Sequence, residues 1–513
     1  MKKSWIAYPY IFALASLLFL YTVTSDIVSP LQLLRPLVVF WALLVLLHIL
    51  MKSVGIDKNW SALMLGVFVL GIFSTRLFFV IAGSISIVSC LLWWLILKIR
   101  KLSVKVNQIA FILNAISVFL VIVFSFWNYL LLRKVPWGDY RQAVEQSRND
   151  LIAKPTTPEN LPDIYYIILD GYGRADILDE IFEYDNSDFI DSLKSRSFIV
   201  PEESHSNYPR TVLSVASTLN MDYISTLIPG LEDSIFWWLM SPLIDHSQTR
   251  LMLESVGYQM VSVATDWSIT DNTSTDFYFK PNPVSLSDFE NHLVTTTPLG
   301  FLLSPVIRSF SSLPSFDGHR ESIDYSFKTL SDIPEMPGAK FTFSHIVTPH
   351  PPFVFNENGN SIDPDYKFWF ADGISFPGGK EEYRDGYVNQ LVYTNTRILE
   401  VVDDIIARSK TPPIIIIQAD HGPGLSTDFS SSDNTCLKER FSVFAAYYLP
   451  GVDAGEVPND LSGVNIFRLI QNLYFGTDLP LLENKYLYTK DALFIYQAED
   501  VTFRVEEPCE IFE

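Results

Sequence analysis

Two short apolar runs in this 513-residue chain end in side chains that bind metal ions. Asp170 follows the run 164–169, and Asp420 and His421 follow the run 414–418. Continuous apolar runs of this length are typical of buried strands in a parallel sheet. In open α/β sheets the site lies at the carboxyl ends of the strands, so we expect these three side chains to converge. Two carboxylates and an imidazole suit one divalent ion; the alternative is a helix cap at Asp170 and an ordinary turn at Asp420.

A candidate nucleophile lies between the two runs. Thr211 follows Pro209 and Arg210 and begins a stretch with small and apolar residues at helical spacing. A hydroxyl at a helix N-terminus lies at the positive end of the helix dipole, where anions also bind. Bound to a metal ion it would ionise more readily. Thr211 as a simple N-cap stays open as an alternative, and so do other nucleophiles, namely Ser206, Ser214 and Ser217. Arg210 is either a ligand for a phosphate oxygen or an ordinary surface arginine.

The elements that must position these residues indicate an α/β domain. Residues 387–410 carry apolar side chains at helical spacing and lead directly into the run 414–418. A helix followed by a strand that ends in an acid is typical of an α/β fold with a largely parallel central sheet. We place this domain at residues 161–513, after a polar linker at 135–160.

The first 134 residues are almost entirely apolar. A membrane-crossing helix takes about 20 residues, and five stretches approach this length: 6–24, 34–51, 60–75, 77–97 and 109–132. With a cytoplasmic N-terminus, the inside segments hold eight Lys or Arg residues, whereas the outside ends and loops between the spans hold only Arg35 and Arg76, as the positive-inside bias requires. We therefore expect a five-span anchor at residues 1–134 and an extracytoplasmic domain after it.

The net charge of −21 separates along the same boundary. Residues 1–134 carry twelve Lys or Arg and two acids, a net +10, which leaves −31 for the rest. This acidity excludes a general nucleic-acid binder. Three cysteines exclude a disulfide scaffold and a four-cysteine zinc site. Cys436 and Cys509 both lie in the external part, where a disulfide is allowed, although their spacing does not specify one.

Three motifs, in order, resemble the sulfatase-like hydrolase/transferase branch of the alkaline phosphatase superfamily. They are Leu169-Asp170-Gly171, the helix start from Thr211 to Ser217, and Ala419-Asp420-His421-Gly422. The resemblance covers roughly residues 160–500. Several spans followed by an external domain also resemble lipoteichoic acid synthases and lipid A phosphoethanolamine transferases.

The resemblance implies a role for each matching residue. Asp170, Thr211, Asp420 and His421 would hold one divalent ion, either Mn, Zn or Mg, and Thr211 would be the nucleophile. His350, in Pro349-His350-Pro351, would donate to phosphate or protonate a leaving group. A loop histidine without such a role is the alternative.

The chain also departs from this pattern. Such transferases usually have Glu where this chain has Asp170, and the Cys-x-Pro-x-Arg motif that makes formylglycine in sulfatases is absent. No histidine follows His421, which favours a mononuclear site over a two-zinc site.

The sequence thus predicts a membrane-anchored, metal-dependent phosphotransferase of the bacterial inner membrane. It would move a phosphoglycerol- or phosphoethanolamine-like group from a membrane lipid donor to an envelope glycan or lipid acceptor through phospho-Thr211. Two alternatives stay open: a phosphodiesterase or sulfatase-like hydrolase that uses water, and a non-catalytic envelope-assembly protein that keeps the fold.

Overall fold

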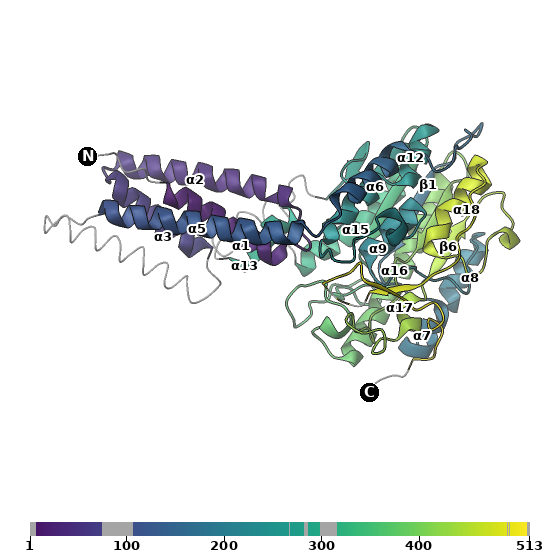
Figure 1. Cartoon of the computed structure of the whole chain (residues 1–513). Coiled ribbons are helices and arrows are strands. Elements are labelled where there is room, and N and C mark those ends of the chain that lie inside the picture. Colours follow the sequence, from purple (N-terminus) through teal and green to yellow (C-terminus); the bar gives the residue numbers. More distant parts are fainter. Residues whose placement is uncertain are drawn as a thin grey trace. The chain divides into compact units, whose positions relative to one another are not determined.

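A computed structural model of the chain describes residues 7–73, 106–265, 267–281, 286–297, 315–489, 491 and 493–509 (Figure 1). The chain divides into two compact units. One comprises Met1–Lys134 with Asn282–Leu313, and the other comprises Val135–Pro281 with Pro314–Glu513.

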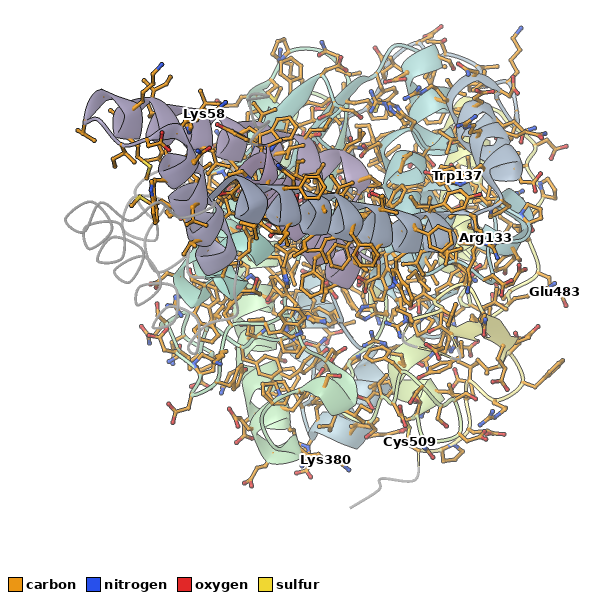
Figure 2. The ribbon with its side chains drawn as sticks, turned by 60° about the vertical axis from the view of Figure 1, so that its left-hand side comes forward. Lys58, Arg133, Trp137, Lys380, Glu483 and Cys509 are labelled. Atoms are coloured by element: carbon orange, nitrogen blue, oxygen red, sulfur yellow. A yellow bond between two sulfur atoms is a disulfide. The ribbon has the colours of Figure 1, made fainter. Side chains whose placement is uncertain are left out.

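The first unit is helical. Its described helices are α1 (Tyr8–Thr24), α2 (Leu34–Ser53), α3 (Lys58–Ile72), α5 (Val106–Leu132) and α13 (Asp288–Thr296). Helix α1 packs along α5 and α3. Lys58, at the start of α3, and Arg133, just after α5, lie at opposite ends of this unit (Figure 2).

The expectation of five spans is corrected. Among the described residues, two helical segments are long and apolar enough to cross a membrane, Pro30–Ser53 and Phe111–Leu132, and they match the second and fifth expected spans. Helices α1 and α3, with 17 and 15 residues, are shorter than the roughly 20 that a span needs. The expected span at 77–97 lies outside the described residues.

The second unit is built on a mixed, mostly parallel sheet. Its strand order is β3-β2-β4-β1-β5-β6, and only the β5–β6 pair is antiparallel. The strands are β1 (Ile164–Leu169), β2 (Gln259–Val263), β3 (Phe277–Phe279), β4 (Lys340–Ile346), β5 (Ile414–Gln418) and β6 (Ala445–Tyr448). A separate antiparallel pair joins β7 (Leu487–Thr489) to β8 (Ala498–Asp500). Both expected strands are present, with β1 between β4 and β5 at the centre.

Helices cover both faces of this sheet. They are α6 (Trp137–Asn149), α7 (Ala175–Phe182), α8 (Ser187–Ser195), α9 (Thr211–Asn220), α10 (Ile224–Leu227), α11 (Ser241–Asp245), α12 (Gln248–Ser255), α15 (Phe316–Asp332), α16 (Lys380–Arg408), α17 (Leu437–Phe441) and α18 (Gly463–Phe475). Tyr165 and Ile167 of β1 pack in a core with α7, α8, α15 and α16. Tyr166, which points the other way, contacts Phe467 of α18, and α18 packs on α9. Since both faces are covered, β1 is apolar throughout and wholly buried.

The expected unit boundaries differ from the observed ones at two places. Residues 137–149, expected in a polar linker, form α6, whose Tyr140 and Ser147 donate hydrogen bonds to Leu239 O and Asn220 Oδ1 of the sheet-containing unit. Residues of α13, expected in the external domain, belong to the helical unit, where Phe289 and Leu293 pack with apolar side chains of α1, α2 and α3. The polarity of these two segments does not show to which unit each belongs, because that is decided by the side chains against which they pack.

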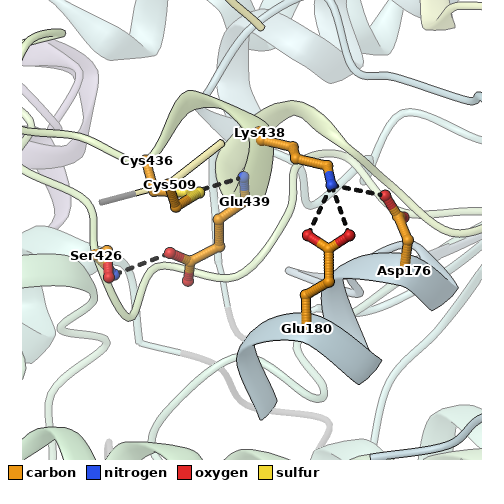
Figure 3. The surroundings of a disulfide bond; sticks show 7 residues. All are labelled: Asp176, Glu180, Ser426, Cys436, Lys438, Glu439 and Cys509. Atoms are coloured by element: carbon orange, nitrogen blue, oxygen red, sulfur yellow. Dashed lines mark hydrogen bonds and ion pairs between the residues drawn. A yellow bond between two sulfur atoms is a disulfide. The ribbon is translucent and has the colours of Figure 1, made fainter. Parts of the chain in front are cut away.

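A disulfide joins Cys436 to Cys509, with 5.1 Å between their Cα atoms (Figure 3). Cys436 precedes α17, and its Sγ accepts from the backbone N–H of Glu439. Next to it, Lys438 pairs with Glu180 and Asp176 of α7. The disulfide therefore ties the end of the described chain to α17.

Candidate metal centre

The carboxyl ends of β1 and β5 bring three metal-binding side chains together. Asp170, Asp420 and His421 are all buried, and one ligand atom from each lies within 4.8 Å of the others. The His421 Nε2 atom is 3.4 Å from Asp170 Oδ1 and 3.3 Å from Asp420 Oδ2. The two strands are parallel neighbours in register, so the residues that follow them meet at one edge of the sheet.

Glycines make the two turns possible. Gly171 adopts φ +73°, a left-handed conformation that side chains rarely adopt, and its N–H donates to Asp420 Oδ1 at 3.3 Å. A Cβ at Gly422 would collide with the carbonyl oxygen of Glu439. The glycines that follow Asp170 and His421 are therefore needed for the two turns that hold the cluster.

The cluster has the hydrogen-bonding pattern of a cation site. The Nδ1–H of His421 donates to its neighbour's carbonyl, Gly422 O, at 3.0 Å, which leaves a lone pair on Nε2. That lone pair faces Asp170 Oδ1 and Asp420 Oδ2, two buried oxygens without a hydrogen-bond partner. Two carboxylate oxygens that lack a donor among the described residues, and that face an imidazole lone pair, fit a bound divalent ion.

The charge states suit metal binding. Burial raises the pKa of Asp170, but His350, His345 and His421 outweigh it and hold this pKa below its ordinary value, so the side chain is a carboxylate. Burial and the nearby Arg440 lower the pKa of His421, which favours the neutral imidazole that binds metals.

Thr211 lies beside this cluster. It is the first residue of α9, and its Oγ1 is 3.2 Å from His421 Nε2. The competing hydroxyls are engaged elsewhere or lie deeper: Ser206 donates to Tyr208 O, Ser217 donates to Ser214 O, and Ser214 is buried one turn into α9. Of the four candidate hydroxyls, that of Thr211 contacts His421.

Two histidines lie on the same side of the sheet. The rings of His350 and His421 are 6.1 Å apart, and His350 donates from Nδ1 to Pro351 O, so Nε2 points to Asp372 Oδ2 at 3.8 Å. His345, in β4, contacts Asp170 Oδ2 through Nε2 at 3.2 Å and Thr270 Oγ1 through Nδ1 at 2.8 Å. His345 therefore fixes the orientation of Asp170.

Sequence reasoning missed a buried ion pair next to these residues. Arg440, whose side chain is 2% exposed, donates from Nη1 to Asp372 Oδ2 at 2.6 Å. Burial raises the pKa of Asp372, but Arg440 and then His350 and His421 outweigh it and lower this pKa to about 2. Asp372 lies in a loop and Arg440 in the five-residue helix α17, and neither position carries a periodic pattern or a motif.

Arg210, the residue before Thr211, is buried. Its Nε donates to Thr489 Oγ1 at 3.0 Å, and its guanidinium faces the rings of Phe429 and Trp237, at 4.4 and 5.1 Å from their centroids. Burial lowers the pKa of Arg210 to about 10, so it stays cationic at neutral pH. It is therefore no ordinary surface arginine.

No family model matches the chain, and no curated protein matches it. Solved structures do. The chain is similar to phosphoethanolamine transferases. The C-terminal periplasmic domain of EcEptC from Escherichia coli, solved in complex with Zn, is 12% identical and has a TM-score of 0.44, with 66% of this chain and 92% of that chain covered.

Two further structures are similar over much of the chain. The integral membrane protein lipooligosaccharide phosphoethanolamine transferase A (EptA) from Neisseria meningitidis is 12% identical with a TM-score of 0.42, over 81% of this chain and 75% of that one. A Bacteroides thetaiotaomicron glycosaminoglycan-metabolism protein, BT33494S-sulf, is 13% identical with a TM-score of 0.39, over 64% and 80%. Phosphoethanolamine transferases, one of the groups that the sequence resembles, are thus among the structures to which the chain is similar.

Proposed function

We propose that this chain is a membrane-anchored, metal-dependent phosphotransferase. It moves a phospho-head group, phosphoglycerol- or phosphoethanolamine-like, from a membrane lipid to an envelope glycan or lipid through phospho-Thr211. The observation that carries this proposal is the contact of the Thr211 hydroxyl with His421, within a buried set of two carboxylates and an imidazole. A hydroxyl at a helix N-terminus beside a cation site is suited to attack a phosphoryl group.

The residues divide the work as follows. Asp170, Asp420, His421 and the Thr211 hydroxyl would hold one divalent ion, either Mn, Zn or Mg, and this ion would supply Lewis-acid chemistry to the phosphoryl group and to the hydroxyl. Thr211 Oγ1 loses its proton to water and forms a bond to phosphorus. The bond from phosphorus to the lipid alcohol breaks, and His350 Nε2 donates the proton that this alcohol needs.

The second half of the reaction is the reverse of the first, with the acceptor in place of the lipid alcohol. An acceptor hydroxyl attacks the phosphorus of phospho-Thr211, and its proton returns to His350 Nε2. The bond from phosphorus to Thr211 Oγ1 breaks, and Oγ1 takes back a proton from water to become the free hydroxyl. Asp372 Oδ2, 3.8 Å from His350 Nε2, faces the atom from which this proton leaves in the first half and to which it returns in the second. Water in place of the acceptor would make the same site a hydrolase.

The helical unit supports a membrane location. In the two candidate spans only 17% and 11% of the residues are buried, and large apolar side chains such as Val38, Phe111 and Phe119 are more than 60% exposed. Exposed apolar surface on this scale needs a lipid environment. The Cys436–Cys509 disulfide supports an oxidising, extracytoplasmic location for the other unit.

The test is mass spectrometry of the full chain after incubation with native bacterial membranes. We expect an added mass on the tryptic peptide that contains Thr211, equal to the transferred phospho-head group, and a loss of turnover of at least roughly 1000-fold in Thr211→Ala. Thr226→Ala, which removes an exposed threonine hydroxyl downstream of α9, is the matched control and keeps both signals. Full turnover in Thr211→Ala contradicts the assignment of the nucleophile.

A further inference from the structure

The guanidinium of Arg210 has unusual neighbours. Phe429 and Trp237 face it, and its Nε is bonded to the neutral hydroxyl of Thr489. The residue as a whole is 7% exposed. A buried cation next to aromatic rings and a hydroxyl has lost most of its water and has gained no anionic partner there.

Two hydrogen-bond donors of these side chains have no acceptor. Arg210 Nη2 and Trp237 Nε1 are both buried and unpartnered in the described part of the chain. The guanidinium carbon lies 5.1 Å from the centroid of the Trp237 ring, so the two unpartnered donors belong to side chains in contact. Each unpaired buried donor costs free energy, more so for a charged group, unless a ligand supplies the acceptor.

No described carboxylate neutralises Arg210 within ion-pair distance. Asp491 favours its charge from further away, but Asp491 Oδ1 already accepts from the backbone N–H groups of Leu493 and Phe494. Arg440, on the other side of the Phe429 ring at 5.1 Å, shows the contrast, because it is paired with Asp372. Of these two buried arginines around Phe429, one has an internal anion and the other lacks one.

Arg210 is next to the candidate nucleophile in the chain. Arg210 is the N-cap residue of the ten-residue helix α9, and Thr211 follows it directly. The positive end of the helix dipole adds to the charge of the guanidinium at this point. An anion bound there would lie next to the Thr211 hydroxyl.

We propose that Arg210 Nη2 and Trp237 Nε1 form an anion subsite that binds a phosphate oxygen of the substrate beside Thr211. The subsite deepens the proposed function, on which its catalytic meaning rests, and it makes the site selective for anionic phosphoesters over neutral esters. Phosphate binding itself does not require that Thr211 be a nucleophile.

The experiment measures the binding of inorganic phosphate to the metal-loaded full chain in detergent by isothermal titration calorimetry. All variants carry Thr211→Ala, so that binding cannot turn into covalent transfer, and their metal content is checked. We expect Arg210→Gln to raise the dissociation constant for phosphate by about 10- to 100-fold and Trp237→Phe to raise it by about 3- to 10-fold. The effect expected for Trp237→Phe is smaller because this substitution keeps an aromatic ring and removes only the N–H.

Matched controls separate the subsite from general effects. Arg196→Gln removes a surface arginine that pairs with Asp403, and Trp238→Phe changes the neighbouring tryptophan, so both should stay within about twofold of the parent. If Arg210→Gln does not fold, Trp237→Phe still decides. Unchanged phosphate affinity in the folded subsite variants overturns the subsite, whereas full turnover in Thr211→Ala overturns the proposed function.

Discussion

At the scale of single residues, the metal centre stores like-charge repulsion. Asp170 Oδ1 and Asp420 Oδ2 are buried acceptors in the same small cluster, and the His421 lone pair faces both. Without a cation, two carboxylates at this distance destabilise the folded chain. With a divalent ion bound, the attraction of each carboxylate to the cation would make the same arrangement stabilising.

This repulsion gives Asp420→Asn an unusual expected effect. The amide keeps the oxygen that accepts from Gly171 N–H but removes one negative charge. We expect the metal-free variant to melt at or above the temperature of the metal-free parent, because the repulsion is relieved, while losing the stabilisation that added Mn, Zn or Mg gives the parent. Differential scanning fluorimetry with and without chelator, together with metal analysis of the purified chain, measures both effects.

His246→Asn is the control, since His246 lies outside the cluster and should leave metal content at about one ion per chain. Parent-like metal binding in Asp420→Asn would contradict the ligand assignment.

Part of the site could be predicted from the sequence. Asp170, Asp420 and His421 follow apolar runs, and the carboxyl ends of neighbouring parallel strands must meet, so their convergence follows from topology. Asp372 and Arg440 could not be predicted in this way. They come from a loop and a very short helix, where only the three-dimensional packing brings a given carboxylate to a given guanidinium.

At the scale of elements, Arg440 joins three segments of the site. From α17 its Nε donates to Pro209 O, in the turn before α9, and its Nη1 donates to Gly422 O, in the turn after β5, and to Asp372. Lysine cannot satisfy three acceptors in these directions with one ammonium group on a flexible stem. Arg440 is thus a positioning residue for the segments that carry Thr211 and His421.

Removal of this arginine should destabilise the chain strongly. Arg440→Met leaves Asp372 buried without its partner, and we expect a loss of about 3–5 kcal/mol in the free energy of unfolding. The double variant Arg440→Met/Asp372→Asn should recover part of the loss, because no unpaired charge remains. Urea denaturation of the full chain in detergent gives the free energies. Lys438→Met, on the same helix but with a more exposed ion pair to Glu180, should cost at most about 1 kcal/mol.

Additive effects of Arg440→Met and Asp372→Asn would contradict the coupling.

The contribution of Asp372 to stability depends on pH with a defined sign. Since the folded pKa of Asp372 is about 2, below its ordinary 3.8, its contribution is complete above about pH 4 and is lost as the pH falls through about 2.

The elements themselves were predictable where periodicity was strong. The apolar runs became β1 and β5, and the helix expected at 387–410 is α16, which starts seven residues earlier, at Lys380, in a stretch rich in charged residues. Polar α6 was expected as a linker, because an amphipathic helix that packs through a few side chains such as Tyr140 has little apolar content of its own.

At the scale of the whole molecule, the two units differ in the polarity and the charge of their surfaces. The helical unit exposes apolar side chains and carries the excess of basic residues, and the sheet-containing unit carries a net −30. A negative domain repels anionic substrates at long range, so the substrate must be held by local cations, for which the metal centre and Arg210 are the candidates.

The disulfide provides the test at this scale. Cys436 and Cys509 are 73 residues apart, and closing such a loop restricts the unfolded chain, so we expect Cys509→Ser to lower the free energy of unfolding by roughly 2–4 kcal/mol. Urea denaturation of the full chain in detergent, with and without dithiothreitol, measures the change. The reductant should destabilise the parent by the same amount and leave Cys509→Ser unaffected. Because Cys436 Sγ also accepts from the Glu439 N–H at the start of α17, Cys436→Ser retains an acceptor there and should match Cys509→Ser. An equal response of parent and Cys509→Ser to reductant would show that the two sulfurs are not joined in the folded protein, and with that the support for an oxidising location would be lost.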